Sequence, residues 1–457
     1  MMIQCLTKDI KTKSIPIFAT SEEDFAKDSK KWDIVGRSFA KEMGFQGKSR
    51  TLCCMPQGGL ISHVVYGIST DPFEAAWDAA FLAKNLLPQN AYHFDNTDVS
   101  EEMAVAWALA AYHFQVDQNK PKEIPTLRIP QSLNLASIKA TVDAICLIRT
   151  LINRPANLLT PEDLSKEART LAKKHKATFK EIVGEDLLKE NYPLIHAVGK
   201  AAATPPRFIE ISWGDPKHFH LALVGKGITF DTGGLHIKTG NYMNLMKKDM
   251  GGAAHALGLA HWIMDQKLPI HLTLCIPIAE NAIAGNAMRP GDIVYARNGL
   301  SVAIEDTDAE GRLILADALT RATELNPDLI IDFATLTGAA RIALGTEIPA
   351  LFTNTEPHQV TLTQLGKTLH DPLWPLPLWP GYAASLKSPV ADMQNIATSS
   401  YGGAITAALF LERFVQKTPW IHMDLMAWNL QNRPGRPVGG EAQAFRAFCA
   451  FIQGLCC

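Results

Sequence analysis

The second half of the chain alternates between short, mostly apolar runs and stretches in which apolar residues recur every three or four positions. The runs at 220–224, 270–278 and 329–336 predict buried strands. The helical spacing predicts helices around 257–264 and over 313–325. Buried strands that alternate with helices are typical of a sheet with parallel strands and helices on both faces. The pattern therefore predicts an α/β fold, with ligand sites at the carboxyl ends of the strands.

The first 115 or so residues show a different pattern, with shorter strands. Residues 50–55 and 62–67 predict strands, and residues 72–87 and 101–114 predict amphipathic helices. A polar segment with several prolines, 117–130, is the best candidate for a linker. These features predict a small N-terminal α/β domain.

A long helix is predicted at 137–152, where Asn-Arg-Pro follows at 153–155. We therefore expect an N-terminal domain over residues 1–135. Residues 136–457 would hold the linking helix and the catalytic domain.

Charge and composition exclude several classes of protein. The 457 residues include 44 Lys and Arg against 46 Asp and Glu, a formal charge of −2, which gives no electrostatic footprint for nucleic acid or an anionic membrane. No stretch is long and apolar enough to span a bilayer, and the first residues lack the apolar core of an export signal. The eight Cys include no C-x-x-C pair. We expect a cytoplasmic protein without membrane or nucleic-acid partners.

Familiar hydrolase and nucleotide-binding motifs are absent from the sequence. It contains no H-E-x-x-H, no G-x-S-x-G, no phosphate loop ending in G-K-[ST], and no G-x-G-x-x-G after a strand. If the chain is an enzyme, carboxylates and lysines must therefore carry most of its chemistry.

The first cluster of polar residues lies at 223–254, in a glycine-rich segment that follows a predicted strand. It contains Lys226, Asp231, Lys238 and Asp249. Its glycines permit backbone conformations and close approaches that other residues resist. The alternative interpretation is a set of Lys–Asp ion pairs around a turn.

The second cluster, EDTDAEGRLIL at 305–315, lies at a predicted junction between a strand and a helix. If the chain is extended there, Asp308, Glu310 and Arg312 project to one side. A helix N-terminus, where acidic residues are favoured, would account for Glu310 but not for Asp306 and Asp308.

Together the two clusters bring several carboxylates and lysines but only one histidine, His236, which we leave out of the site. Crowded carboxylates repel one another unless cations neutralise them. Oxygen ligands suit Mg²⁺ or Mn²⁺, and Zn²⁺ also accepts carboxylates. The residues therefore predict metal-assisted hydrolysis, but they do not identify the substrate.

At these residues the sequence closely resembles the leucyl aminopeptidase family of cytosolic dinuclear-metal aminopeptidases. The family hallmark N-T-D-A-E-G-R-L is similar to DTDAEGRL at 306–313. VGKGITFDTGG at 224–234 and MKKDMGGAA at 246–254 match two further blocks, and the likeness spans about 153–448.

The resemblance implies a role for each matching residue. Asp231 and Glu310 would bridge two divalent ions, Zn²⁺, Mn²⁺ or Mg²⁺. Asp308 would complete one metal site, and Lys226 and Asp249 the other.

The resemblance also implies the reaction. Lys238 would stabilise the developing oxyanion, and Arg312 would hold a bicarbonate ion that acts as general base. A hydroxide bridging the metals would attack the scissile carbonyl and release the N-terminal residue of short peptides that have a free N-terminus.

The family fold has a C-terminal catalytic domain with a central mixed sheet and a smaller N-terminal α/β domain with an assembly or regulatory role. Family members form homohexamers. Some members bind DNA, so a DNA-binding or regulatory protein on the same fold is the rival interpretation. A third interpretation is a catalytically inactive scaffold protein.

Two departures from the family pattern bear on specificity and metal binding. Asp306 replaces Asn, which could tighten metal binding or make the bridging water less acidic; the alternative is an Asp that hydrogen-bonds to the backbone. Met426 stands where Ala is usual. It could narrow the pocket for the first side chain, which the resemblance also assigns to Met246, Thr335 and Gly338, or it could belong to the core.

Overall fold

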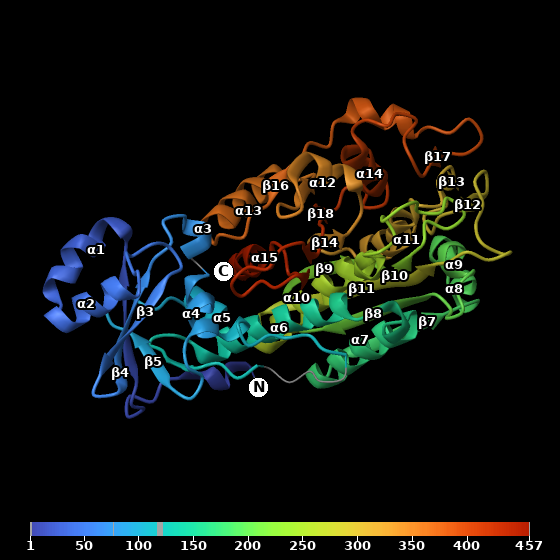
Figure 1. Ribbon diagram of the computed structural model, residues 1–457. Helices are drawn as coiled ribbons and strands as arrows, with labels where there is room; N and C mark the ends of the chain where they lie inside the picture. The colour runs from blue at the N-terminus through green and yellow to red at the C-terminus, as the bar shows by residue number, and fades with distance from the viewer. Residues whose placement is uncertain (1, 76, 117–121, 457) are drawn as a thin grey trace. The chain divides into compact units, whose positions relative to one another are not determined.

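The computed structural model describes residues 2–75, 77–116 and 122–456 (Figure 1). The chain divides into two compact units, Met1–Cys146 with Gln431–Val438, and Leu147–Leu430 with Gly439–Cys457. Part of the predicted linker, 117–121, lies outside the described residues. Its later part contains strand β6, Thr126–Arg128, which pairs with β1 (Leu6–Thr7) and β5 (Ala91–Phe94) and so belongs to the first sheet.

The first unit is built on a six-stranded sheet, counted over the described residues, with the order β1-β6-β5-β2-β4-β3. The two strands predicted here are confirmed as β3 and β4, with small shifts at their ends. The helix predicted at 72–87 is two shorter helices, α3 and α4, and the helix predicted at 101–114 ends at Leu109. The elements are β1 Leu6–Thr7, β2 Ile15–Thr20, α1 Glu22–Asp28, α2 Ile34–Glu42, β3 Leu52–Gln57, β4 Leu60–Gly67, α3 Pro72–Ala75, α4 Asp78–Asn85, β5 Ala91–Phe94 and α5 Glu101–Leu109.

The second unit contains a mixed sheet of nine strands among the described residues, in the order β16-β15-β18-β14-β9-β11-β8-β7, with β10 paired to β11. Strands β11, β9, β14 and β18 are parallel neighbours, whereas the pairs β7–β8, β8–β11 and β15–β18 are antiparallel. This confirms the α/β fold and the mixed sheet. The strands are β7 Thr178–Val183, β8 Arg207–Trp213, β9 Phe219–Gly225, β10 Gly227–Asp231, β11 Ile270–Asn281, β14 Leu329–Ala334, β15 Ala350–Thr353, β16 Trp374–Pro375 and β18 Trp420–Asp424.

Helices cover both faces of this sheet, as its strand pattern requires. Along β9, Ala222 and Val224 belong to the core beneath α9, α11 and α14, so the alternating Leu221 and Leu223 face the other side. On that side α10 packs against β9, β14, α7 and α15 (Figure 1). The helices are α6 Leu135–Asn153, α7 Pro161–His175, α8 Asp186–Lys189, α9 Pro193–Gly199, α10 Gly251–Gln266, α11 Glu310–Glu324, α12 Gly338–Leu344, α13 Glu356–Thr368, α14 Gly403–Glu412 and α15 Phe445–Gly454.

Short strands complete the second unit and lead into the site. They are β12 Ile293–Tyr295, β13 Ser301–Ala303, β17 Met393–Gln394, β19 Trp428–Asn429 and β20 Gly439–Gly440. Helix α11 begins at Glu310, so the expectation that residues 308–312 are extended is wrong for Glu310 and Arg312. The acidic run does lie at a junction between a strand and a helix, because β13 precedes it. Within the described residues, none of the helices has both the length and the apolar character needed to cross a bilayer.

The carboxyl ends of several strands meet at one edge of the second sheet. Strand β9 ends immediately before Lys226, β10 ends at Asp231, β11 ends at Asn281, and β14 ends immediately before Thr335. Because these strands are parallel neighbours, their carboxyl ends converge, and open α/β sheets bind ligands at such an edge.

Candidate metal and catalytic site

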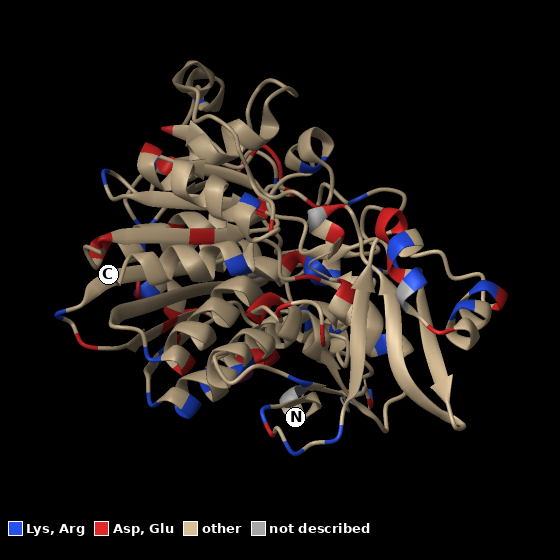
Figure 2. Cartoon of the chain, turned by 90° about the vertical axis from the view of Figure 1, so that its left-hand side faces the viewer, with Lys and Arg blue, Asp and Glu red and all other residues tan. Residues whose placement is uncertain are grey.

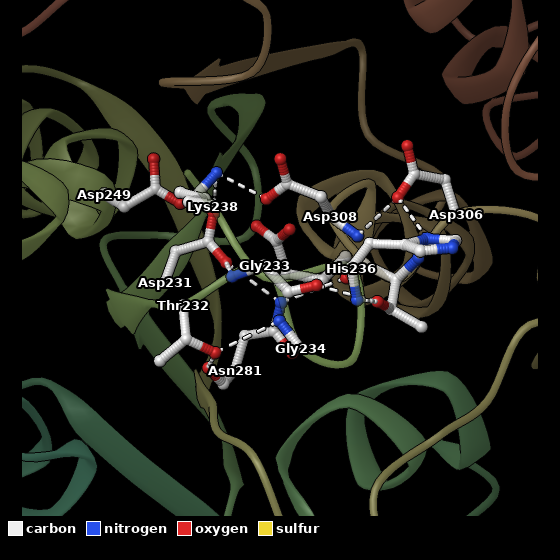
Figure 3. Close-up of polar contacts among 12 residues, drawn as sticks. Asp231, Thr232, Gly233, Gly234, His236, Lys238, Asp249, Asn281, Asp306 and Asp308 are labelled. Atoms are coloured by element: carbon white, nitrogen blue, oxygen red, sulfur yellow. Dashed lines mark hydrogen bonds and ion pairs between the residues drawn. The ribbon is translucent and has the colours of Figure 1, made fainter. Parts of the chain in front are cut away.

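Two lysines and four carboxylates form the centre of the site. Lys226 Nζ lies 2.6 Å from Asp249 Oδ2 and 3.0 Å from Glu310 Oε1. Lys238 Nζ lies 2.7 Å from Asp231 Oδ2 and also contacts a carboxylate oxygen of Asp308 (Figure 3). The fold thus brings together side chains that are up to 84 positions apart in the sequence, from Lys226 to Glu310.

The carboxylates are arranged as a potential set of metal ligands. One oxygen from each of Asp231, Asp308 and Glu310 lies within 4.8 Å of the other two. Glu310 is buried, and its Oε2 has no hydrogen-bond partner among the described residues. A buried, unpaired carboxylate oxygen is costly unless it binds a cation. The donor set therefore fits divalent metal ions.

The pKa values show the electrostatic strain of this crowding. Burial and the charge of Asp231 raise the pKa of Glu310 to about 8, and the same two causes raise the pKa of Asp308 to about 6. Burial alone would lower the pKa of Lys226, but Asp249, Glu310 and Asp231 outweigh it and raise that pKa. The excess of acidic groups favours the binding of additional positive charge.

Neighbouring groups hold the Asp231 carboxylate in one orientation. Asp231 Oδ1 accepts hydrogen bonds from the Gly233 N–H and from Asn281 Nδ2, both at 2.9 Å (Figure 3). Gly233 has φ +87°, and a Cβ there would lie 2.3 Å from the carbonyl oxygen of His236, so this turn requires glycine. Thr335 similarly donates to Asp249 Oδ1 at 2.8 Å. Both aspartates are therefore pre-oriented.

A cavity of about 380 Å³ opens onto these groups. It is lined by six of the seven residues to which metal or catalytic roles were assigned and by three of the four pocket residues, Lys226, Asp231, Lys238, Asp249, Asp308, Glu310, Met246, Thr335 and Gly338.

Two residues of the predicted site do not line this cavity. Arg312 is buried and donates from Nη1 to the carbonyl oxygen of Asn395 at 2.8 Å. Met426 is half-buried outside the lining.

Asp306 replaces the Asn of the family pattern, and its position favours the interpretation that it hydrogen-bonds to the backbone. Its Oδ1 accepts the Asp308 N–H at 2.8 Å and lies 2.9 Å from His236 Nδ1 (Figure 3). Asp306 does not line the cavity, and its carboxylate holds the turn that carries Asp308.

Several lining residues were missed by the sequence analysis. His236 lies at the cavity, although a lone histidine gave no reason to include it, and Tyr242, Lys248 and Arg341 also line it. Lys248 directly precedes Asp249, and Arg341 follows Gly338 by one helical turn, so spacing relative to assigned residues could have identified both.

Comparisons with known proteins agree with this geometry. The family described as "Cytosol aminopeptidase family, catalytic domain" matches residues 146–448, and the family "M17 aminopeptidase, N-terminal domain" matches residues 15–130. The two matches cover parts of both units, and the first includes every assigned site residue.

Individual relatives and solved structures show the same likeness. A probable cytosol aminopeptidase of Synechococcus sp. is 37% identical over 446 residues, which is 89% of this chain and 87% of that protein. The crystal structure of a cytosol aminopeptidase from Coxiella burnetii superposes with a TM-score of 0.94 at 42% identity, covering 99% of this chain and 100% of that one. The bottromycin maturation enzyme BotP, in complex with Mn, superposes with a TM-score of 0.84 at 30% identity, covering 97% and 99%.

These matches do not support the rival interpretation of a DNA-binding protein. Figure 2 shows Lys and Arg residues scattered among Asp and Glu residues across the chain, in keeping with the formal charge of −2. The resemblance to leucyl aminopeptidases is confirmed. The chain belongs to the cytosol aminopeptidase family and is a hydrolase, a metal-dependent aminopeptidase.

Proposed function

We propose that the carboxylate–lysine cluster holds two divalent ions and removes the N-terminal residue from short peptides. Asp231 and Glu310 would bridge the two ions, Asp308 would complete one metal site, and Lys226 and Asp249 the other. The observation that carries this proposal is the buried Oε2 of Glu310, which has no hydrogen-bond partner among the described residues, beside carboxylates whose oxygens lie within 4.8 Å.

When bound, such a metal pair supplies an acidified water and polarises the scissile carbonyl. The other steps belong to the residues of the chain. Lys226 can bind a metal only as a neutral amine, so it must lose its proton as the ion enters. Lys238 keeps its charge and lies at the cavity wall, where it can stabilise negative charge that develops on the carbonyl oxygen.

Arg312 is the candidate for holding the general base. Its Nε is buried and has no hydrogen-bond partner among the described residues, while Nη1 is held by Asn395. An unpaired guanidinium N–H two residues after Glu310 can donate a hydrogen bond to a small anion such as bicarbonate. In this role Arg312 acts by positioning the anion.

The relatives and the family resemblance support our proposals for the metal, the assembly and the location. Mn²⁺ is our first candidate because the BotP structure contains Mn, and Zn²⁺ and Mg²⁺ are chemically compatible with the same ligands. The names of the relatives support a cytoplasmic location and peptide substrates. We extend the family's homohexameric assembly to this chain.

The test is hydrolysis of a panel of aminoacyl amides by protein stripped of metal and then reconstituted with Mn²⁺ or Zn²⁺. We expect turnover only after reconstitution, and its loss in Lys238→Ala. The control is Lys217→Ala, an exposed lysine outside the cavity. Turnover that needs no metal, or that survives in Lys238→Ala at the wild-type rate, would overturn the proposal.

A further inference from the structure

The cavity contains two cations that the carboxylate cluster does not use. Its charged lining residues divide evenly, four cationic and four anionic, Lys226, Lys238, Lys248, Arg341, Asp231, Asp249, Asp308 and Glu310. Lys226 and Lys238 between them contact all four carboxylates at 3.0 Å or less. Lys248 and Arg341 are therefore two cations of the same cavity that contact none of the four carboxylates within 3.0 Å.

The geometry of these two cations suits an external anion. Lys248 is 1% exposed, and Asp249 Oδ1 is 3.6 Å from its Nζ, beyond hydrogen-bond distance. Neither a hydrogen bond nor an ion pair joins the Arg341 guanidinium to any residue that the structure describes. A guanidinium is charged at all working pH values and offers a planar fork of donors that matches a carboxylate.

Arg341 also lies beside a residue of the pocket assigned to the first side chain of the substrate. It follows Gly338 on helix α12, and one of its terminal nitrogens is 3.7 Å from the position that a Cβ of residue 338 would occupy. Because residue 338 has no side chain, the guanidinium is accessible from the cavity. An anionic group bound there would belong to the N-terminal residue of the peptide.

We propose that Arg341, assisted by Lys248, is a specificity-determining residue that selects peptides whose N-terminal residue is Glu or Asp. The inference rests on the proposed function, because it assumes that Gly338 lines the pocket for the first side chain. The recognised chemistry is a carboxylate, which a substrate could also present at its C-terminus. The distance to Gly338 favours the side chain.

The test compares the Glu and Gln amides, which are isosteric and differ in charge, with the apolar Leu amide as a reference. Glu-, Gln- and Leu-aminomethylcoumarin amides have no C-terminal carboxylate, so a preference for Glu over Gln reports on the side chain alone. We expect kcat/KM for Glu to exceed that for Gln by about tenfold, on the scale of one charge-assisted pair. Arg341→Met should bring the ratio close to 1, and Arg341→Lys should restore part of it.

The matched control is Arg289→Met, which removes an exposed arginine outside the cavity and should leave the ratio unchanged. Turnover of the Gln and Leu amides with no preference for Glu overturns this inference alone. The inference would also be overturned if Arg341→Met left the Glu-to-Gln ratio unchanged but lowered the hydrolysis of Leu-Leu more than that of Leu-Leu-amide. That result would indicate that Arg341 binds the C-terminal carboxylate of the substrate. Failure to hydrolyse any amide would overturn the proposed function and this inference with it.

A separate observation concerns a cluster at the far end of helix α10. His175 Nε2, His261 Nδ1 and Asp265 Oδ1 form a triangle with sides of 3.2, 3.6 and 4.0 Å. Three ligands of one tetrahedral Zn²⁺, each about 2.05 Å from the metal, would lie about 3.3 Å apart. The three atoms are therefore close to the spacing of one face of such a site.

The surroundings of this cluster suit a cation. The side chains of His175 and His261 are 9% and 7% exposed, and burial lowers the pKa of His175, which favours the neutral ring that binds metal. His175 is the last residue of α7, where the helix dipole is negative. Lys174 Nζ lies 3.3 Å from Asp265 Oδ1, but its side chain is half exposed and can move into solvent.

We infer that His175, His261 and Asp265 form a second, structural site for Zn²⁺ or a similar transition metal, which links α7 to α10. Equilibrium dialysis of the full chain against Zn²⁺ tests this. We expect His261→Gln and Asp265→Asn each to bind one ion fewer than the wild type. His271→Gln is the control, because that histidine stacks on His220 elsewhere in the unit. Equal Zn²⁺ content in all four proteins would overturn the inference.

Discussion

Gly311→Ala should separate activity from stability at the proposed metal site. Gly311 lies in the first turn of α11, directly after Glu310. An alanine Cβ there would lie 2.3 Å from Cε and 2.6 Å from Nζ of Lys226. The nearest atoms belong to the tip of a flexible side chain, so the lysine must move while the helix remains in position.

The size of the effect follows from these distances. Ordinary van der Waals contact begins at 3.4 Å, so the Lys226 amine must move away by about 1 Å, which breaks its contacts with Asp249 and Glu310. A displacement of about 1 Å in a catalytic group costs about 100-fold in rate, or about 2.7 kcal/mol of transition-state stabilisation. The helix itself gains up to about 1 kcal/mol from the change of Gly to Ala.

The assay measures kcat/KM for a leucine amide, the metal content and the thermal midpoint of the variant. We expect a loss of about 100-fold in kcat/KM and reduced metal content, with a thermal midpoint near that of the wild type. Gly454→Ala, a helical glycine with open space around it, is the control and should change neither activity nor metal content. Activity within threefold of the wild type would refute the assigned role of Lys226.

Three further predictions concern stability and specificity. Both ring nitrogens of buried His255 are hydrogen-bonded in the neutral form, and burial lowers its pKa from 6.5 to about 4. Between these two pH values the unfolded state binds a proton that the folded state does not. Acidification from pH 6.5 to pH 5 should therefore lower the free energy of unfolding by about 2 kcal/mol, as measured by urea titration, and His255→Gln should not show this decrease. Glu441→Gln should cost about 3 to 5 kcal/mol in the same titrations, because it leaves the fully buried Arg149 without its carboxylate; a loss under 1 kcal/mol would contradict this. Because Met426 does not line the cavity, Met426→Ala should change the Leu-to-Ala amide ratio by less than about twofold, and a larger change would return Met426 to the pocket.

Local sequence determined the type of most elements and the chemistry available to them. Strand β14 could be predicted because a strand buried on both faces is a continuous apolar run, and helix α11 because its apolar residues recur at helical spacing. The absence of histidine-based motifs, with carboxylates and lysines concentrated in two segments, was enough to predict metal-assisted hydrolysis. The hallmark at 306–313 then identified the family, which the comparisons confirm.

Tertiary structure alone decided which side chains share one cavity. Strand order and register are non-local, and they bring the ends of β9, β10, β11 and β14 to one edge. The same convergence brings Arg341 of α12 and the buried Lys248 into a cavity with the carboxylates, although the sequence analysis assigned a role to neither residue. The tertiary structure also decided that Glu310 begins a helix, because α11 packs against β9 and β11 from this point. A local pattern specifies whether a residue is buried, but only the packed sheet specifies its neighbours.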